Sequence, residues 1–276
     1  MLQPIKGKRK SPRRIMLMGT NYVGKSTLAA QAEGVFFIDC ENGLDDIDCE
    51  RTPVASSIDT VFEWMVWLGQ KEQDYQWLAI DALESVERLI QDKVVKDKNA
   101  KSFGDPCFDY GRGRKLCQPY WDRFYKGIKW LQSEKRMGVI FCTHVESVEV
   151  KPPNAEAFHR FEPPLDKEAR ETICDWCTEI FFLSFRELTR TQDDGFNRER
   201  KIAIDCDRER FIRTQPTTGI RAKNRLGMPE EIPFNDPREA WSIIKRFMDS
   251  AGHEQAGNIN GVVVNGSSKQ QVTEVA

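Results

Sequence analysis

The sequence predicts an α/β fold, in which helices flank a mainly parallel sheet and antiparallel strands extend it toward the C-terminal end. Three observations predict this class. Up to residue 144, short apolar runs of strand length alternate with helical patterns, as in parallel βαβ units. A glycine-rich segment joins the first of these strands to a helix. After residue 178, two strand patterns flank an Asp-Gly turn, which indicates an antiparallel hairpin.

The individual elements follow from the hydrophobic period and from turn residues. Strands are predicted where short apolar or aromatic runs are bounded by turn formers, at 14–18, 35–41, 77–81, 138–144, 179–188 and 200–205. Helices are predicted mainly where apolar residues recur every three or four positions, at 25–33, 59–70, 82–98, 115–135, 166–177 and 236–249. Glycine and proline mark two long loops, at 99–113 and 145–165.

The composition fits one folded domain between two polar ends. Of 276 residues, 39% are hydrophobic and 30% are charged, and the net charge is −2, as in ordinary globular proteins. No apolar run approaches the roughly 20 residues of a membrane-spanning helix. Eight cysteines without a signal peptide predict reduced thiols in the cytoplasm. We expect a basic flexible arm at 1–12, the folded domain at 13–250 and a disordered polar tail at 251–276.

Residues 19–26, Gly-Thr-Asn-Tyr-Val-Gly-Lys-Ser, form a complete phosphate-binding motif between a strand and a helix. Backbone N–H groups of such a loop surround the phosphates, Lys25 reaches the β- and γ-phosphates, and the Ser26 hydroxyl ligates Mg²⁺. The motif predicts a bound nucleotide phosphate and Mg²⁺ but is shared by kinases, GTPases and ATPases; the resemblance described below implies that the cofactors are ATP and Mg²⁺. The predicted ATP-binding residues are Gly19, Thr20, Asn21, Tyr22, Val23, Gly24, Lys25, Ser26 and Thr27.

Three polar residues at strand ends are candidates for the remaining chemistry. Asp81 ends the strand at 77–81 and is predicted to hold Mg²⁺ with Ser26; capping of the next helix is a compatible role. Glu41 follows the second strand and is predicted to orient or deprotonate the attacking water, with Asp39 as the alternative. His144 follows the fourth strand and is predicted to sense the γ-phosphate, a purely structural histidine being the alternative.

The order of these parts resembles the core of RecA-type ATPases. The segment FIDCENGLDDID, residues 37–48, is similar to the one that carries the catalytic glutamate of RecA-family recombinases. The resemblance implies that the loops at 99–113 and 145–165 grip single-stranded DNA. RecA itself has a glutamine where His144 stands.

A second motif resembles RadA-type proteins. Residues 221–234, RAKNRLGMPEEIPF, are similar to the K-N-R-F-G motif of that family, with Leu226 in place of phenylalanine. The resemblance implies that Lys223 and Arg225 reach the nucleotide of a neighbouring subunit. On a strand both would point to the same side, where two cations can neutralise charge on the γ-phosphate. A basic turn without a catalytic role is the alternative.

As a whole, residues 13–249 look most like compact phage ATP-binding proteins with a minimal RecA core, the AAA-class family that includes Sak-type single-strand annealing recombinases. The resemblance implies a DNA-stimulated ATPase of recombination and replication in a bacterial host cytoplasm. It also implies a homo-oligomeric ring or filament with nucleotide at subunit interfaces. The expected partners are single-stranded DNA and a single-strand binding protein, and no membrane.

The two loops offer residue-level support for DNA binding, because cations suit the phosphate backbone and aromatic rings can stack on bases. The predicted DNA-binding residues are Lys101, Phe103, Arg112, Arg114, Lys151 and Arg160. For each loop, a solvated surface with aromatic rings anchored in the core is the alternative.

Two other functions stay open at the level of sequence. One is an ATP-regulated DNA-binding or assembly protein with negligible turnover, and the other is a P-loop kinase. A GTPase and an ABC-type ATPase are disfavoured, because the sequence contains neither N-K-x-D nor L-S-G-G-Q.

Overall fold

A computed structural model describes residues 11–70, 72–153, 156–186, 188–193, 199–204 and 209–250. The tail predicted at 251–276 and most of the basic arm predicted at 1–12 lie outside these residues. None of the helices in the described part of the chain is both long and apolar enough to cross a membrane.

An eight-stranded sheet forms the centre of the molecule, in the order β12-β11-β8-β1-β5-β4-β2-β3. Its strands are β1 (Arg14–Gly19), β2 (Val35–Asp39), β3 (Glu50–Arg51), β4 (Trp77–Asp81), β5 (Gly138–Thr143), β8 (Glu179–Phe185), β11 (Arg210–Arg213) and β12 (Glu231–Pro233). Neighbouring strands from β8 to β3 are parallel, and β11 and β12 join antiparallel. This arrangement confirms the predicted fold class.

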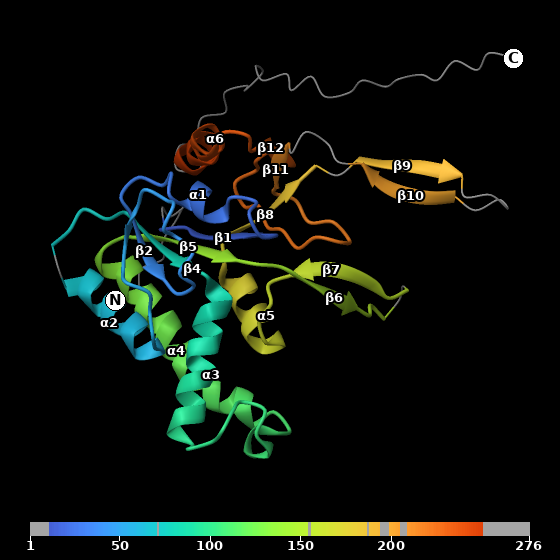
Figure 1. Ribbon diagram of the computed structural model, residues 1–276. Helices are drawn as coiled ribbons and strands as arrows, with labels where there is room; N and C mark the ends of the chain where they lie inside the picture. Colours follow the sequence, from blue (N-terminus) through green and yellow to red (C-terminus); the bar gives the residue numbers. More distant parts are fainter. Residues whose placement is uncertain are drawn as a thin grey trace, which may run out of the picture.

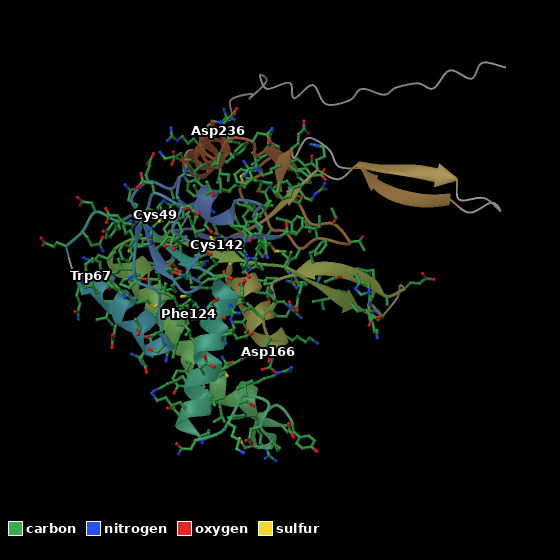
Figure 2. All side chains as sticks on the ribbon, viewed as in Figure 1. Cys49, Trp67, Phe124, Cys142, Asp166 and Asp236 are labelled. Atoms are coloured by element: carbon green, nitrogen blue, oxygen red, sulfur yellow. The ribbon has the colours of Figure 1, made fainter. Side chains whose placement is uncertain are left out.

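Helices cover both faces of the sheet (Figure 1). They are α1 (Lys25–Ala29), α2 (Ile58–Gln70), α3 (Leu83–Asp97), α4 (Arg112–Glu134), α5 (Lys167–Trp176), α6 (Pro237–Ser250) and the short 3₁₀ helix η1 (Pro106–Phe108). Strand β1 shows how the faces differ, since side chains alternate along a strand. Ile15 and Leu17 pack into the core with α1 and α6. Met16 and Met18 pack into the core with α2 to α5, which contains Phe124, labelled in Figure 2.

Two antiparallel hairpins leave the body of the protein on the same side (Figure 1). Their strands are β6 (Glu146–Val150) with β7 (Phe158–Glu162), and β9 (Leu188–Asp193) with β10 (Glu199–Ile204). An antiparallel hairpin with β10 as its second strand was predicted here, but its first strand is β9. The strand predicted at 179–188 instead forms β8 of the central sheet. The predicted Asp-Gly turn at 194–195 lies outside the described residues. The prediction of one long loop at 145–165 is wrong, because β6 and β7 lie within it. Pro152 and Pro153 lie between β6 and β7, and Pro163 and Pro164 follow β7, so both strands are free of proline.

Other differences concern element ends. Helix α1 ends at Ala29, short of the predicted 25–33, because the chain turns back to enter β2. Helix α4 begins at Arg112, inside the predicted loop at 99–113, directly after Gly111 in a left-handed conformation. Strands β3, β11 and β12 have only two to four residues, too few to show a period in sequence.

Candidate active site

The site lies at the carboxyl ends of four neighbouring strands, β1, β5, β4 and β2 (Figure 1). The register aligns these ends, with Met18 beside Thr143, Cys142 beside Asp81, and Asp81 beside Asp39. Figure 2 labels Cys142 within this central sheet. The phosphate loop therefore starts at the same edge where Asp81 ends β4, His144 follows β5 and Glu41 follows β2. Loops at the carboxyl ends of parallel strands are the usual place for ligand sites.

The phosphate loop has the backbone that its motif requires. Gly24 has a φ of +100°, which favours glycine, and a Cβ there would lie 2.9 Å from Arg210 Nη1. The buried Lys25 ammonium donates to the carbonyls of Gly19 at 3.2 Å and Thr20 at 3.0 Å, so it lies against the loop itself. Burial lowers the pKa of Lys25, although nearby thiol and carboxylate groups favour its charged form. The loop can therefore hold a phosphate group beside the Lys25 ammonium.

Ser26 and Asp81 form the pair predicted to hold Mg²⁺. Burial raises the pKa of Asp81 to about 6, although a hydrogen bond from Ser26 lowers it. A hydroxyl and a carboxylate oxygen are ligands that Mg²⁺ prefers. Helix α3 takes Ala82 as its N-cap, without a side-chain hydrogen bond, so Asp81 does not cap it.

The structure separates the roles of Glu41 and Asp39. Asp39 is buried, and its Oδ1 accepts the backbone N–H groups of Glu41 at 3.0 Å and Asn42 at 2.7 Å. Asp39 therefore shapes the turn after β2. The Glu41 side chain is 35% exposed, and its Oε1 lies 3.9 Å from His144 Nδ1. Glu41 is thus the carboxylate that remains available at the edge of the site.

The sequence did not predict Glu84, a buried acid in the first turn of α3. Its Oε2 accepts from the Thr143 hydroxyl at 2.9 Å, and its Oε1 accepts from the backbone N–H of His144 at 3.1 Å and is bonded to His144 Nδ1. Burial alone would raise the pKa of Glu84, but these hydrogen bonds lower it overall. Its only signal in the sequence is its place three residues after Asp81.

Arg210 is a second residue that sequence reasoning missed. It lies on β11, and its Nη1 donates to the Val23 carbonyl of the phosphate loop at 3.3 Å. Its Nη2 donates to the Asn235 carbonyl at 3.1 Å, and its guanidinium lies 4.6 Å from the Phe234 ring centroid. Arg210 thus supports the phosphate loop from the antiparallel part of the sheet, a contact between segments distant in sequence.

Lys223 and Arg225 lie away from the phosphate loop of their own chain. Lys223 forms an isolated antiparallel bridge with Ile180 near the start of β8, at the end of the parallel strands opposite the phosphate loop. The motif forms no strand, so the alternation of a strand does not place Lys223 and Arg225 on one side. The Lys223 ammonium donates to the carbonyls of Cys174 at 3.2 Å and Asp175 at 2.8 Å, at the end of α5. Arg225 is exposed and forms no hydrogen bond or ion pair with the described residues.

Asn224 and Gly227 explain the local structure of this motif. The Asn224 Oδ1 accepts the backbone N–H groups of Leu226 at 3.1 Å and Met228 at 3.2 Å. Gly227 has a φ of +68°, which favours glycine. The motif therefore builds a turn that leaves Arg225 on the surface.

The six predicted DNA-binding residues do not form one surface. The segment 99–111 lies at the far end of α3, whereas the hairpin β6–β7 points sideways from the sheet (Figure 1). Lys101 and Arg112 are exposed, while Phe103 is half-buried and stacks on Phe108 at 5.2 Å. The other three predicted residues form ion pairs, Arg114 with Asp166 (labelled in Figure 2), Lys151 with Glu149, and Arg160 with Glu162.

A phosphate loop beside a hydroxyl–carboxylate pair, at the carboxyl edge of a parallel sheet, defines a P-loop nucleotide-binding protein. A family model described as "AAA domain" matches residues 11–226. The chain belongs to this family of AAA-domain proteins.

Comparisons with single proteins, as opposed to a family, give a match among solved structures. No curated protein matches the chain. Among solved structures, it is similar to the flagellar accessory protein FlaH from Methanocaldococcus jannaschii, with 12% sequence identity and a TM-score of 0.32. The match covers 78% of this chain and 91% of that chain.

Proposed function

We propose that this protein is a Mg²⁺-dependent ATPase that acts on single-stranded DNA, as a RecA-like recombinase or single-strand annealing protein of phage or bacterial recombination and replication. One observation carries the ATPase part. Lys25 and Ser26 at the start of α1, Asp81 at the end of β4, and Glu41 after β2 come from three segments and lie at the carboxyl ends of neighbouring strands. Binding alone would need the first three, whereas a free carboxylate at Glu41 supports activation of water.

The segment around η1 supports the DNA part of the proposal. Lys98, Arg112 and Lys115 line a cavity of about 480 Å³ whose apolar wall includes Phe108. None of these three cations forms an ion pair with a described residue. Tyr110, beside them in sequence, is 94% exposed. Unpaired cations around apolar and aromatic surface suit a phosphate backbone with unstacked bases.

The position of Arg225 supports an oligomer. An exposed cation at the end of the sheet opposite its own phosphate loop can serve a nucleotide only across a subunit interface. We therefore propose a ring or filament in which Arg225 meets the ATP of the next subunit and neutralises charge on its γ-phosphate. In this assembly Lys223 holds the end of α5 against the motif.

The first test is steady-state ATP hydrolysis with and without single-stranded DNA. We expect DNA to stimulate turnover. Lys25→Ala should lower kcat by at least about 100-fold, because it removes the cation beside the phosphates. Glu41→Gln should lower kcat by roughly 100- to 10,000-fold with little change in ATP affinity, because it removes the base but not the phosphate site.

Two other outcomes would indicate a different function. Tight ATP and DNA binding with turnover that Glu41→Gln leaves unchanged would indicate an assembly protein that uses ATP as a ligand. Turnover that ignores DNA and rises with a small phosphate acceptor would indicate a kinase. Either result contradicts the proposal.

A further inference from the structure

Glu84 links α3 to the end of β5 through three hydrogen bonds. One carboxylate oxygen accepts from the Thr143 hydroxyl at 2.9 Å. The other accepts the backbone N–H of His144 at 3.1 Å and is bonded to the Nδ1 of the same residue. Three bonds from two consecutive residues fix both the backbone and the imidazole of His144 on a single buried side chain.

This contact determines which ring nitrogen of His144 carries the proton. The hydrogen bonds lower the pKa of Glu84, so its carboxylate is ionised at neutral pH and only accepts hydrogen bonds. Nδ1 is therefore assigned as the donor. Glu41 does not compete for that proton, because its Oε1 lies 3.9 Å from Nδ1, beyond hydrogen-bond distance. In the neutral ring, Nε2 then keeps a lone pair and acts as an acceptor.

We propose that Glu84 is a positioning residue that holds His144 in the Nδ1-protonated form, so that Nε2 accepts a hydrogen bond from the water that attacks the γ-phosphate. The inference rests on the proposed ATP hydrolysis. A neutral imidazole with a bare Nε2 cannot donate to a phosphate oxygen. His144 therefore responds to the γ-phosphate through the attacking water, which it orients while Glu41 takes the proton.

The test compares Glu84→Gln with a matched control, Glu87→Gln. Glu87 lies one turn further along α3, is also buried, and accepts the backbone N–H of Asp166 at 3.0 and 3.1 Å, next to α5. We expect Glu84→Gln to lower kcat by roughly 10- to 100-fold, as loss of an orienting partner does, with KM within about 2-fold. Glu87→Gln should leave both unchanged.

A second readout does not depend on turnover. Nitrogen-15 NMR of labelled histidines reports the tautomer directly, and His144→Gln assigns the signal among the three histidines. We expect the Nδ1-protonated form in the wild type and a mixture in Glu84→Gln, because a glutamine side chain can donate as well as accept. Adding Glu84→Gln to His144→Gln should lower kcat by less than about 2-fold more.

Two results would overturn the inference: an Nε2-protonated His144 in the wild type, or a Glu84→Gln variant whose kcat equals that of Glu87→Gln. A wild type without ATP hydrolysis would defeat the proposed function instead. The tautomer measurement would then still decide whether Glu84 sets the state of His144.

Discussion

The buried environment of the Glu87 carboxyl group disfavours its ionised form. Burial raises the pKa of Glu87 to about 7, although the backbone N–H of Asp166 and the charge of Arg170 lower it. In the unfolded chain the same carboxyl titrates near 4.5. Between these values the folded state binds more protons than the unfolded state, so the free energy of unfolding falls as pH rises.

Glu87→Gln should remove this dependence. At pH 8 the wild type bears the full cost of an ionised Glu87, about 3 kcal/mol at most, and at pH 5 it bears little of it. Relative to the wild type, the variant should therefore gain stability from pH 5 to pH 8. Urea denaturation of both proteins at the two pH values measures the difference, and parallel pH profiles would contradict the expectation.

Among single residues, the sequence predicted those that belong to a local motif. Lys25 and Ser26 follow from spacing within eight residues, and Asp81 follows from its place after an apolar strand. Glu84 and Arg210 could not be predicted in the same way. Their partners, His144 and Val23, are 60 and 187 residues away in the chain, and only the folded sheet brings them together.

At the level of elements, the first residues of β4 and β5, Trp77 and Gly138, pack closely because they are paired in the sheet. A Cβ built on Gly138, which begins β5, would lie 2.4 Å from ring atoms of Trp77, which begins β4. The Trp77 ring is also packed edge to face against Trp241 of α6, with centroids 5.6 Å apart. The ring therefore has little freedom to move away from a larger residue at this position.

Gly138→Ala should lower the free energy of unfolding by about 1 to 3 kcal/mol, the usual cost of overpacking a core. Gly104→Ala is the control, since the nearest atom to its Cβ, Ser102 Oγ, lies at 3.7 Å. Guanidinium denaturation measures both. Equal midpoints for the two variants would show that the ring yields at no cost.

Elements with one buried face could be predicted well, and elements without one could not. Helix α2 was predicted within one residue because Val61, Phe62, Met65 and Leu68 mark its buried face. Strand β6 has no buried residue, and only Val148 and Val150 alternate with the exposed Glu149, which is too short a run to identify a strand. Its proline neighbours were then the only signal, and they favoured a loop.

On the scale of the whole molecule, the candidate catalytic edge and the candidate DNA surface are separate. The candidate catalytic residues lie at the carboxyl ends of the strands. The candidate DNA surface, formed by Lys98, Arg112 and Lys115 around one cavity, lies where α3 ends at Asp97. The helix α3 joins the two, since it begins after Asp81 and ends at Asp97. Changes at the candidate DNA surface should therefore alter DNA binding without disturbing the nucleotide site.

The double variant Arg112→Ala/Lys115→Ala should weaken single-stranded DNA binding and reduce the slope of log K against log salt by about 1 to 2, because it removes two phosphate contacts. The charge-matched control is Arg238→Ala/Arg246→Ala, two exposed positions on α6 across the sheet. Fluorescence anisotropy at several salt concentrations measures both. An equal loss in the control would assign the effect to net charge alone.

The hairpin β6–β7 also has a consequence for solubility. Within the described residues, β6 pairs only with β7, so its outer backbone groups remain open to pairing with another chain. Such edges nucleate aggregation unless charges interrupt them. Glu146 and Glu149 place charged side chains on this edge strand, where they pair with Arg170 and Lys151. Charged side chains on an edge strand oppose strand addition of this kind, so replacing Glu149 with an apolar residue should make the protein more prone to aggregate.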